Sequence, residues 1–483
     1  MRLFSSMQLR IPSICLLALA LAGCQRQVKS ELSTPSPTPL PQDTFVQAYF
    51  NQEPTSKYTD PYRNLTRLGD DLEQKIVEAI VSAQSTVDVA VQELRLPRIA
   101  QALVDRHKAG VKVRVIIENI YARSYSSYTD TEVEKLPKRE RDRYADSLRL
   151  IDLNGDGQLS QSEIDQRDAL AILLKAKIPL INDSADGSKG SDLMHHKFVI
   201  VDGQRLVVTS ANFTMSDVHG DLSRPASRGN ANSLLNIESS QLATLFTEEF
   251  NLMWGDGPGG KPDSKFGLQK LPRPPRSMTI GDTLITVHFS PTSSKLPWSQ
   301  SSNGLIGKTL SSGTQAIDMA LFVFSDQTLV DLLETSHLQG VKIRALIDPG
   351  FMYRSYSEGL DMLGVSLVDS VSAKKGKCKY EAQNRPWTSP MTTVGVPRLP
   401  PGDLLHHKFG LVDAKTAIMG SHNWTTAANT GNDETLLVVQ NPIVAAHYQR
   451  EFERLYTNAI LGLPPAIQRK VDAQQKQCKS AGL

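Results

Sequence analysis

The feature that most constrains the fold is an internal repeat. A short alternating strand, a helical run and a second strand opening at a glycine return in the same order 230 residues later. The two copies are 87–90, 97–108 and 110–114, and then 317–320, 327–337 and 340–344. Strands that alternate with helices favour α/β layers. The repeat therefore predicts an α/β fold of two similar sandwich halves.

Composition changes along the chain predict where these halves begin and end. Prolines alternate with small polar residues before the first half, and a Gly-, Pro- and Lys/Arg-rich stretch separates the halves. The predicted segments are a signal peptide at 1–23, a linker at 24–44, a first half at 45–254 with an insertion at about 129–177, a connector at 255–283, a second half at 284–460 and a C-terminal tail at 461–483.

Both halves carry the same polar motif at equivalent places. Each motif has His-x-Lys, an aspartate five residues after the lysine, and then a Ser-x-Asn turn. The residues are His195, Lys197, Asp202, Ser210 and Asn212 in the first half, and His406, Lys408, Asp413, Ser421 and Asn423 in the second. Residues two apart on a strand face the same side, so each histidine points with its lysine. Lysine and amide donors suit phosphoryl oxygens.

A lone His-x-Lys would indicate only a strand with polar residues, but the doubled motif resembles the signature of the phospholipase D superfamily over roughly residues 45–460. The resemblance implies halves packed about a pseudo-twofold axis and one shared active site in a monomer. It also implies a phosphohistidine intermediate formed without a metal, with one histidine as nucleophile and the other as acid and base. Asp202 and Asp413 are then structural, and Ser210 and Ser421 are supporting.

One position distinguishes the two halves. The segment after the second motif carries Glu434, where the first half has the neutral Asn232. In the family, an acid at this position holds a histidine by hydrogen bond, which stabilises its imidazolium form. We therefore predict that His406 has the higher pKa and starts as the acid, which leaves His195 as the nucleophile.

The insertion contains a second motif of a different kind. Residues 152–163 match a twelve-residue EF-hand loop, with helical runs at 140–150 and 163–175 on either side. The predicted calcium ligands are Asp152, Asn154, Asp156, the carbonyl of Gln158, and Glu163. The alternative is a polar loop without an ion. Calcium is expected to be structural or regulatory rather than catalytic.

The N-terminus reads as an export signal that ends in a lipid-attachment site. Arg2 and Arg10 precede the apolar stretch 14–21, which is too short to span a bilayer, and Leu21-Ala22-Gly23-Cys24 resembles a bacterial lipobox. This predicts an exported protein anchored through Cys24 to a bacterial membrane, facing the periplasm or the cell surface. Gln25 follows Cys24, where an aspartate would indicate retention in the inner membrane. The outer membrane therefore stays a candidate location if the cell is Gram-negative. The alternative is an ordinary signal peptide with a chance cysteine.

The other cysteines bear on the compartment. Cys15 lies in the signal, so Cys378 and Cys478 remain, and disulfides persist in exported proteins. A bridge between them is predicted, with two free thiols as the alternative.

Charge and location guide the choice of substrate. Formal net charge is +2, and without Arg2 and Arg10 the chain has 51 basic and 51 acidic residues. Such a balance gives no global attraction to polyanions. The leading hypothesis is a hydrolase or transferase of phospholipid head groups at a membrane. A nuclease of the same superfamily and a non-catalytic calcium-binding surface protein are the alternatives.

Overall fold

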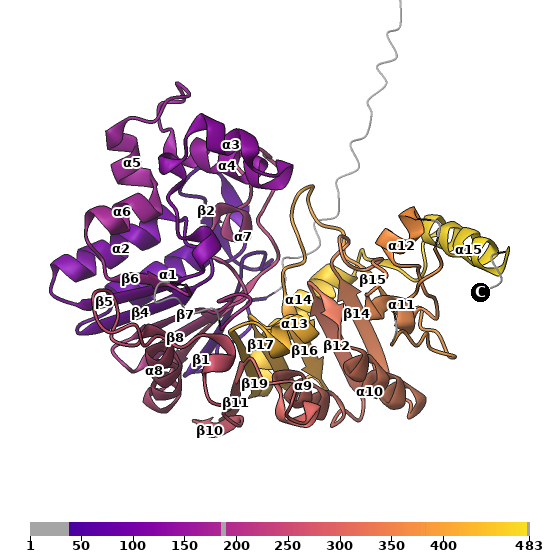
Figure 1. The fold of residues 1–483 in the computed structure, drawn as a ribbon. Helices are drawn as coiled ribbons and strands as arrows, with labels where there is room; N and C mark the ends of the chain where they lie inside the picture. Colours follow the sequence, from indigo (N-terminus) through magenta and orange to yellow (C-terminus); the bar gives the residue numbers. More distant parts are fainter. Residues whose placement is uncertain (1–37, 185–189, 376, 382, 481–483) are drawn as a thin grey trace, which may run out of the picture. The chain divides into compact units, whose positions relative to one another are not determined.

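The computed structural model describes residues 38–184, 190–375, 377–381 and 383–480. The predicted signal peptide, Cys24 and the first part of the linker lie outside these residues. The described chain has a mixed α/β fold with two large sheets, so the predicted fold class is confirmed at this level (Figure 1). Within the described residues, no helix combines the length and the apolar character needed to cross a bilayer.

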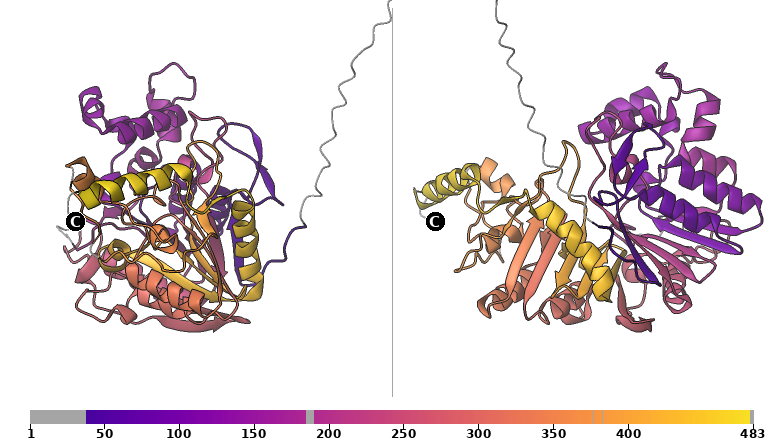
Figure 2. Two further views of the ribbon diagram at one scale, coloured as in Figure 1. Left: turned by 90° about the vertical axis from the view of Figure 1, so that its right-hand side faces the viewer. Right: turned by 180° about the vertical axis from the view of Figure 1, so that it is seen from behind.

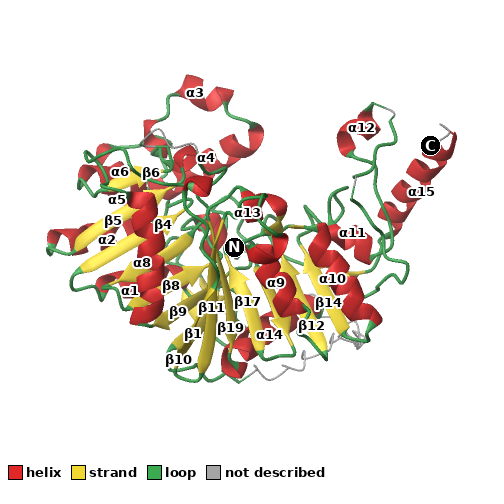
Figure 3. Cartoon of the chain, turned by 60° about the horizontal axis from the view of Figure 1, so that its bottom comes forward, coloured by secondary structure: helices red, strands yellow, loops and turns green. Residues whose placement is uncertain are grey.

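The first sheet has seven strands and the second has nine (Figure 3). In spatial order the first runs β1 (Val46–Phe50), β9 (Ser233–Glu238), β8 (Arg205–Thr209), β7 (Lys197–Val201), β4 (Thr86–Val91), β5 (Lys112–Ile117) and β6 (Leu180–Asn182). The second runs β10 (Arg276–Ile280), β11 (Thr283–Ser290), β19 (Glu434–Gln440), β17 (Thr416–Gly420), β16 (Lys408–Val412), β12 (Ala316–Leu321), β14 (Lys342–Ile347), β15 (Val394–Val396) and β20 (Ile460–Leu461).

The two sheets repeat one topology. In each, the first repeat strand pairs in parallel with the strand after its helix, and antiparallel with the strand that follows the His-His pair of its half. The same ion pair also recurs, since Arg114 binds Asp88 and Arg344 binds Asp318, each through two bonds of 2.7 Å. The strand β10 lies inside the segment predicted as a connector, because 276–280 pairs with β11 as an edge strand.

Helices cover the sheets. Those of the first half include α1 (Leu72–Val81), α2 (Pro97–Lys108) and α8 (Ser240–Trp254), and those of the second include α9 (Ser302–Leu310), α10 (Gln327–Leu338) and α14 (Pro442–Tyr456). Sequence features fix their starts: Pro97 takes the first position of α2, and Asp326 and Asn441 cap α10 and α14. Shorter elements are β2 (Lys57–Thr59), β3 (Thr66–Leu68), β13 (Phe324–Ser325), β18 (Trp424–Thr425), α7 (Met215–Val218), α11 (Glu358–Met362), α12 (Ser370–Lys374) and α13 (Thr426–Thr430). The described chain ends in the long helix α15 (Pro465–Ser480).

One hydrophobic core is shared by both halves. It joins residues of α8 and α14 to inward-facing residues of both sheets. Phe246 of α8 lies 5.0 Å from Phe289 of β11, and Tyr448 of α14 lies 5.0 Å from Phe50 of β1, measured between ring centres. Burial of such rings is a major source of stability. The halves are therefore parts of one packed unit.

The insertion is made of four short helices, α3 (Asp130–Lys135), α4 (Lys138–Ile151), α5 (Gln161–Arg167) and α6 (Ala169–Lys175). Figure 2 shows them beside the first sheet. The run predicted as one helix over 163–175 is two helices. Asp168 separates them, because its side chain accepts the N–H of Ala171 and so caps α6.

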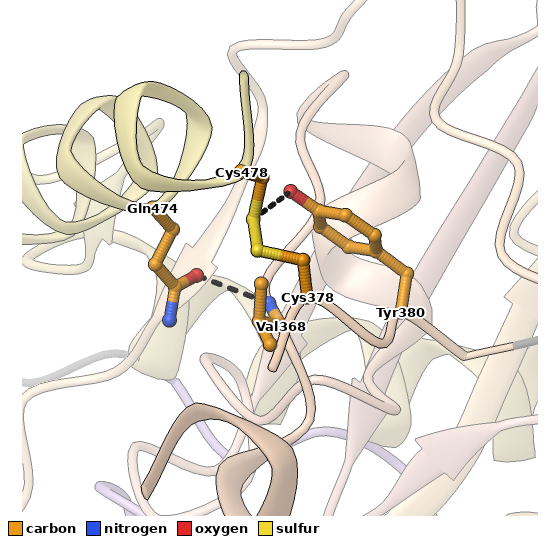
Figure 4. Close-up of a disulfide and its surroundings, with 5 residues drawn as sticks. All are labelled: Val368, Cys378, Tyr380, Gln474 and Cys478. Atoms are coloured by element: carbon orange, nitrogen blue, oxygen red, sulfur yellow. Dashed lines mark hydrogen bonds between the residues drawn. A yellow bond between two sulfur atoms is a disulfide. The ribbon is translucent and has the colours of Figure 1, made fainter. Parts of the chain in front are cut away.

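The predicted disulfide is present and joins Cys378 to Cys478, 100 residues apart (Figure 4). It holds α15 beside the segment after α11. Gln474 accepts the N–H of Val368 at 3.0 Å, and Val471 packs with Leu360 and Leu367. The C-terminal helix is thus fixed by one covalent bond and a small apolar contact.

We expect replacement of Cys378 and Cys478 by serine to release α15 with little effect on turnover. Loss of a crosslink over 100 residues removes up to about 5 kcal/mol of stability in the chain-entropy model. The released helix should be cut early by proteases within 465–480, as mapped by mass spectrometry. Reduction of the wild-type protein should give the same fragments. Unchanged melting and cleavage in the double variant would contradict this expectation.

Candidate active site

The two motifs meet where the halves cross. His195 and His406 each stand two residues before the lysine that opens a strand, Lys197 of β7 and Lys408 of β16. The segment before His195 pairs with the second half, since the His195 N–H donates to the carbonyl of Asp433 at 2.9 Å. The segment before His406 pairs with the first half through Leu405 and Ala231. Both histidines therefore lie where the two halves meet.

Each histidine is held by a residue of the opposite half. The Nδ1 of His195 lies 2.7 Å from Oε2 of Glu434, and the Nδ1 of His406 lies 3.0 Å from Oδ1 of Asn232. The prediction that Glu434 supports His406 is therefore wrong. The prediction paired each histidine with the end of its own half, whereas the crossing segments bring the start of β19 to the first motif.

Burial controls the protonation of both histidines. It lowers the pKa of His195 to about 4, although the Glu434 carboxylate acts in the opposite direction. Burial lowers the pKa of His406 well below its usual value, and the charges of Lys408 and Lys197 lower it further. The carboxylate that was expected to raise the pKa of His406 thus acts on His195 instead. Both rings are neutral near pH 7 until an anionic substrate arrives.

The histidines that directly follow His195 and His406 point away from the candidate site. His196 lies 3.1 Å from Glu249 of α8, and His407 lies 2.8 Å from Glu451 of α14. Both rings are fully buried in the shared core. Alternation along the strand therefore places one histidine of each pair in the candidate site and the other in the core.

Two lysines provide positive charge in the site. The Nζ of Lys197 donates to the carbonyl of His195 at 2.8 Å and to Gln92 at 3.2 Å, and that of Lys408 donates to the carbonyl of His406 at 2.5 Å. Burial lowers the pKa of Lys197 to about 8 and that of Lys408 to about 7. A bound phosphate would favour the charged form of both.

The Ser-x-Asn turns supply the remaining polar groups. The hydroxyl of Ser210 donates to Asn232 at 2.7 Å, and that of Ser421 donates to Glu434 at 2.6 Å, so each serine holds the partner of a histidine. Among the described residues, Oδ1 of Asn212 and Oδ1 of Asn423 are buried without a hydrogen-bond partner. Unpaired buried polar atoms are uncommon and are found at functional sites.

The motif aspartates lie at the other end of their strands. Asp202 accepts the N–H groups of residues 84–86, and Asp413 accepts those of residues 314–316. Burial would raise the pKa of Asp413, yet these donors hold it at about 2. The contacts fix the start of β4 and of β12, in agreement with a structural role.

Both halves that build this geometry match a known protein family. The family model described as "Cardiolipin synthase, PLD-like domain" matches residues 76–254 and 306–456. The match covers more than half of the chain and most strands of both sheets. The chain belongs to this phospholipase D-like family.

Individual relatives match over shorter stretches. The mitochondrial cardiolipin hydrolase of Mus musculus is 28% identical over 163 residues, which are 33% of this chain and 61% of that protein. The phospholipase D of Rickettsia typhi is 24% identical over 156 residues, which are 32% of this chain and 63% of that protein. The chain thus spans only about three fifths of these relatives' length. The crystal structure of phosphatidylserine synthase from Haemophilus influenzae Rd KW20 aligns with a TM-score of 0.54 at 13% identity, over 92% of this chain and 94% of that one, and supports the fold.

A cavity of about 660 Å³ opens between the halves of this phospholipase D-like enzyme. Phe322 connects it to the catalytic centre, because its ring lies 4.9 Å from the ring of His406 and 5.0 Å from Nζ of Lys408. Cationic and acidic side chains are nearly balanced in its lining. They are Arg95, Lys138, Arg139, Arg143, Arg224 and Arg354, with Glu93, Asp142, Asp146, Asp221 and Asp348. Such a lining suits a small polar group more than a long polyanion.

The predicted calcium loop connects α4 to α5. Its side-chain oxygens accept backbone N–H groups of the loop: Asp152 from Gly155 and Gly157, and Glu163 from Leu153 and Asn154. Of the residues that the structure describes, the only three His, Cys, Asp or Glu groups within 4.8 Å of one another are Asp71, Glu73 and His219. These lie away from the loop and beside the guanidinium of Arg98. Calcium binding therefore stays a prediction.

Several residues of the site were not found from the sequence. Gln92 contacts Lys197, and Asp217 accepts the N–H of Asn212 at 2.8 Å and lies 3.6 Å from His406. Glu118 and Asp348 accept hydrogen bonds from the residues that directly precede the two histidines. The repeat contained a signal for the last two, because both are acids that directly follow equivalent strands 230 residues apart.

Proposed function

We propose that this chain is a phosphodiesterase that hydrolyses or transfers phospholipid head groups through a phosphohistidine, without a catalytic metal. The single observation that carries the proposal is the reciprocal support of the two histidines, His195 by Glu434 and His406 by Asn232. This arrangement prepares two neutral imidazoles at one anion site. Membership of the phospholipase D-like family supports the same chemistry.

The proposed reaction has two steps. In the first, binding of the anionic phosphodiester lets His406 take up a proton from water at Nε2. Nε2 of His195 then attacks phosphorus, the bond to the head-group oxygen breaks, and His406 gives that proton to the leaving alcohol. In the second, His406 takes a proton from water or an acceptor alcohol, which attacks phosphorus and releases His195. The Glu434 carboxylate stabilises the positive charge that the His195 ring gains on attack. The two lysines balance the charge on the phosphoryl oxygens.

Three observations favour phospholipid over nucleic acid. The cavity beside Phe322 has a mixed-charge lining, the chain without its predicted signal is neutral, and Cys24 is a predicted lipid-attachment site. An anchored enzyme meets head groups at a high effective concentration. Tyr125 and Phe351 also line the cavity, where amphipathic rings suit an interface.

The test compares purified residues 38–483 on phospholipid vesicles with single- and double-stranded nucleic acid, with and without a chelator. Release of head group that persists in chelator is the expected result. Rapid cleavage of nucleic acid without head-group release would replace the lipid assignment with the nuclease alternative. Absence of both activities would favour the non-catalytic alternative.

We propose that the 152–163 loop binds one calcium ion with a structural or regulatory effect. Its spacing of ligand oxygens between α4 and α5 supports this proposal. Millimolar calcium should raise the melting temperature by a few degrees, because the ion binds only the folded loop. Glu163→Gln should remove the shift, whereas Glu134→Gln, an exposed change outside the loop, should keep it. Calorimetry without calcium binding would refute the proposal.

We also propose that the protein is exported and held on a bacterial membrane through acylated Cys24. The apolar stretch before Leu21-Ala22-Gly23-Cys24 supports it. Cys24→Ala in the full chain should move the protein from the membrane fraction to the soluble fraction. Equal partition of variant and wild type would contradict the proposal.

A further inference from the structure

Two buried carboxylates occupy equivalent places in the two halves. Glu118 directly follows β5, and its Oε2 accepts the N–H of Met194 at 2.6 Å. Asp348 directly follows β14, and its Oδ2 accepts the N–H of Leu405 at 2.9 Å. Met194 and Leu405 immediately precede the two catalytic histidines. Each carboxylate therefore fixes the backbone directly before one of these histidines.

Neither carboxylate contacts the catalytic rings, so any effect on the reaction passes through other groups. Glu118 is 1% exposed and Asp348 is 0% exposed. A buried carboxylate is costly unless hydrogen bonds or a cation compensate it. Burial raises the pKa of Asp348, while the N–H groups of Leu405 and Gly350 and the charge of Lys408 favour its charged form.

The charged surroundings of Lys408 show what Asp348 contributes. Lys197 opposes the charge of Lys408, while the carboxylates of Asp217, Glu434 and Asp348 favour it. Lys408 also lies over the ring of Phe322 and donates to the carbonyl of His406. With a pKa of about 7, Lys408 is close to losing its proton under working conditions. Removing one of the three carboxylates therefore lowers the pH at which that proton is lost.

We propose that Glu118 and Asp348 are positioning residues of the two half-sites. Each fixes the backbone that enters its catalytic histidine, and Asp348 also keeps the Lys408 ammonium charged. The inference rests on the proposed function in one respect, namely that Lys408 binds the phosphate of the substrate. Glu118 differs from Asp348 because burial and the nearby Asp183 raise its pKa to about 7, so its main contribution is the hydrogen bond to Met194.

The test separates the hydrogen bond from the charge. Asp348→Asn keeps an oxygen for the Leu405 N–H and removes the charge, whereas Asp348→Ala removes both. Asp331→Asn, in the same half but on α10, is the matched loss of one negative charge. The readouts are turnover of a soluble phosphodiester and binding of inorganic phosphate by calorimetry, each followed from about pH 6 to 9.

Asp348→Asn should keep turnover within a few-fold of wild type near pH 6 and move the alkaline limb to lower pH by about one unit. Its phosphate affinity should fall about tenfold near pH 8. Asp348→Ala should lose turnover at every pH as well, and Asp331→Asn should match the wild type. An unchanged alkaline limb and unchanged phosphate affinity in Asp348→Asn would overturn the charge role.

The Glu118 variants test the hydrogen bond even if the Asp348 variants do not fold. Glu118→Gln should retain most of the turnover, and Glu118→Ala should lose about tenfold or more. Equal losses in the two would overturn the positioning role. Phosphate binding does not need turnover, so a wild type that binds phosphate but cleaves no phosphodiester would refute the proposed function alone. A wild type that binds no phosphate would overturn the role of Asp348 toward Lys408.

Discussion

Replacing His195 with alanine should reduce phosphodiester turnover by about 10⁶-fold, because it removes the proposed nucleophile and the covalent step with it. The neutral Nε2 of His195 is available for attack, since burial lowers the pKa of the ring to about 4 and Nδ1 faces Glu434. The measurement is steady-state turnover together with acid-quench trapping of labelled substrate. His107→Ala, on α2, is the control that should keep full activity.

His406→Ala separates the two steps. With a leaving group that needs no proton, such as p-nitrophenolate, the first step should proceed and the second should stall. Labelled phosphohistidine should then accumulate and map to His195 by mass spectrometry. A label found on His406 in the wild type would reverse the assignment, and full activity in either alanine variant would refute a shared site.

Glu434→Gln should lower kcat by about 10³-fold, although an oxygen remains to accept the bond from His195. The lost charge is the cause, because the carboxylate stabilises the imidazolium that forms on attack. Burial would raise the pKa of Glu434, but His195 and Lys197 hold it at about 2, so the carboxylate is ionised at neutral pH.

The pH profile of Glu434→Gln provides a second check. Glu434 raises the pKa of His195 against the effect of burial. Without that charge His195 should gain its proton only at lower pH, so the acid limb of kcat/KM should move to lower pH while the maximum falls. Glu453→Gln, exposed on α14, should change neither value. An acid limb that moves to higher pH would contradict the contact between Glu434 and His195.

The repeat was sufficient to predict the class of fold and the order of strand, helix and strand in each half. It could do so because hydrophobic period and turn residues are local properties. The same reliance on local pattern explains why residues 276–280 were predicted to belong to the connector and not to the second sheet. A short exposed edge strand is stabilised by its neighbour β11, and its own sequence carries little signal.

The site was predictable as a set of residues but not as a set of contacts. The motif spacing identified both histidines, both lysines and the Ser-x-Asn turns. It could not say that Glu434 belongs to His195, because that contact joins residues 239 apart through crossing segments of two halves. Likewise Asp217 is one aspartate among many until folding places it beside Asn212.

The reciprocal support of the histidines has a consequence for substitutions in either half. His195 receives its carboxylate from the second half, and His406 receives its amide from the first. If either half loses its support residue, the histidine of the other half loses its hydrogen-bond partner. A substitution at 232 therefore acts on the histidine of the second half, and one at 434 acts on the histidine of the first, whereas the insertions lie outside this exchange.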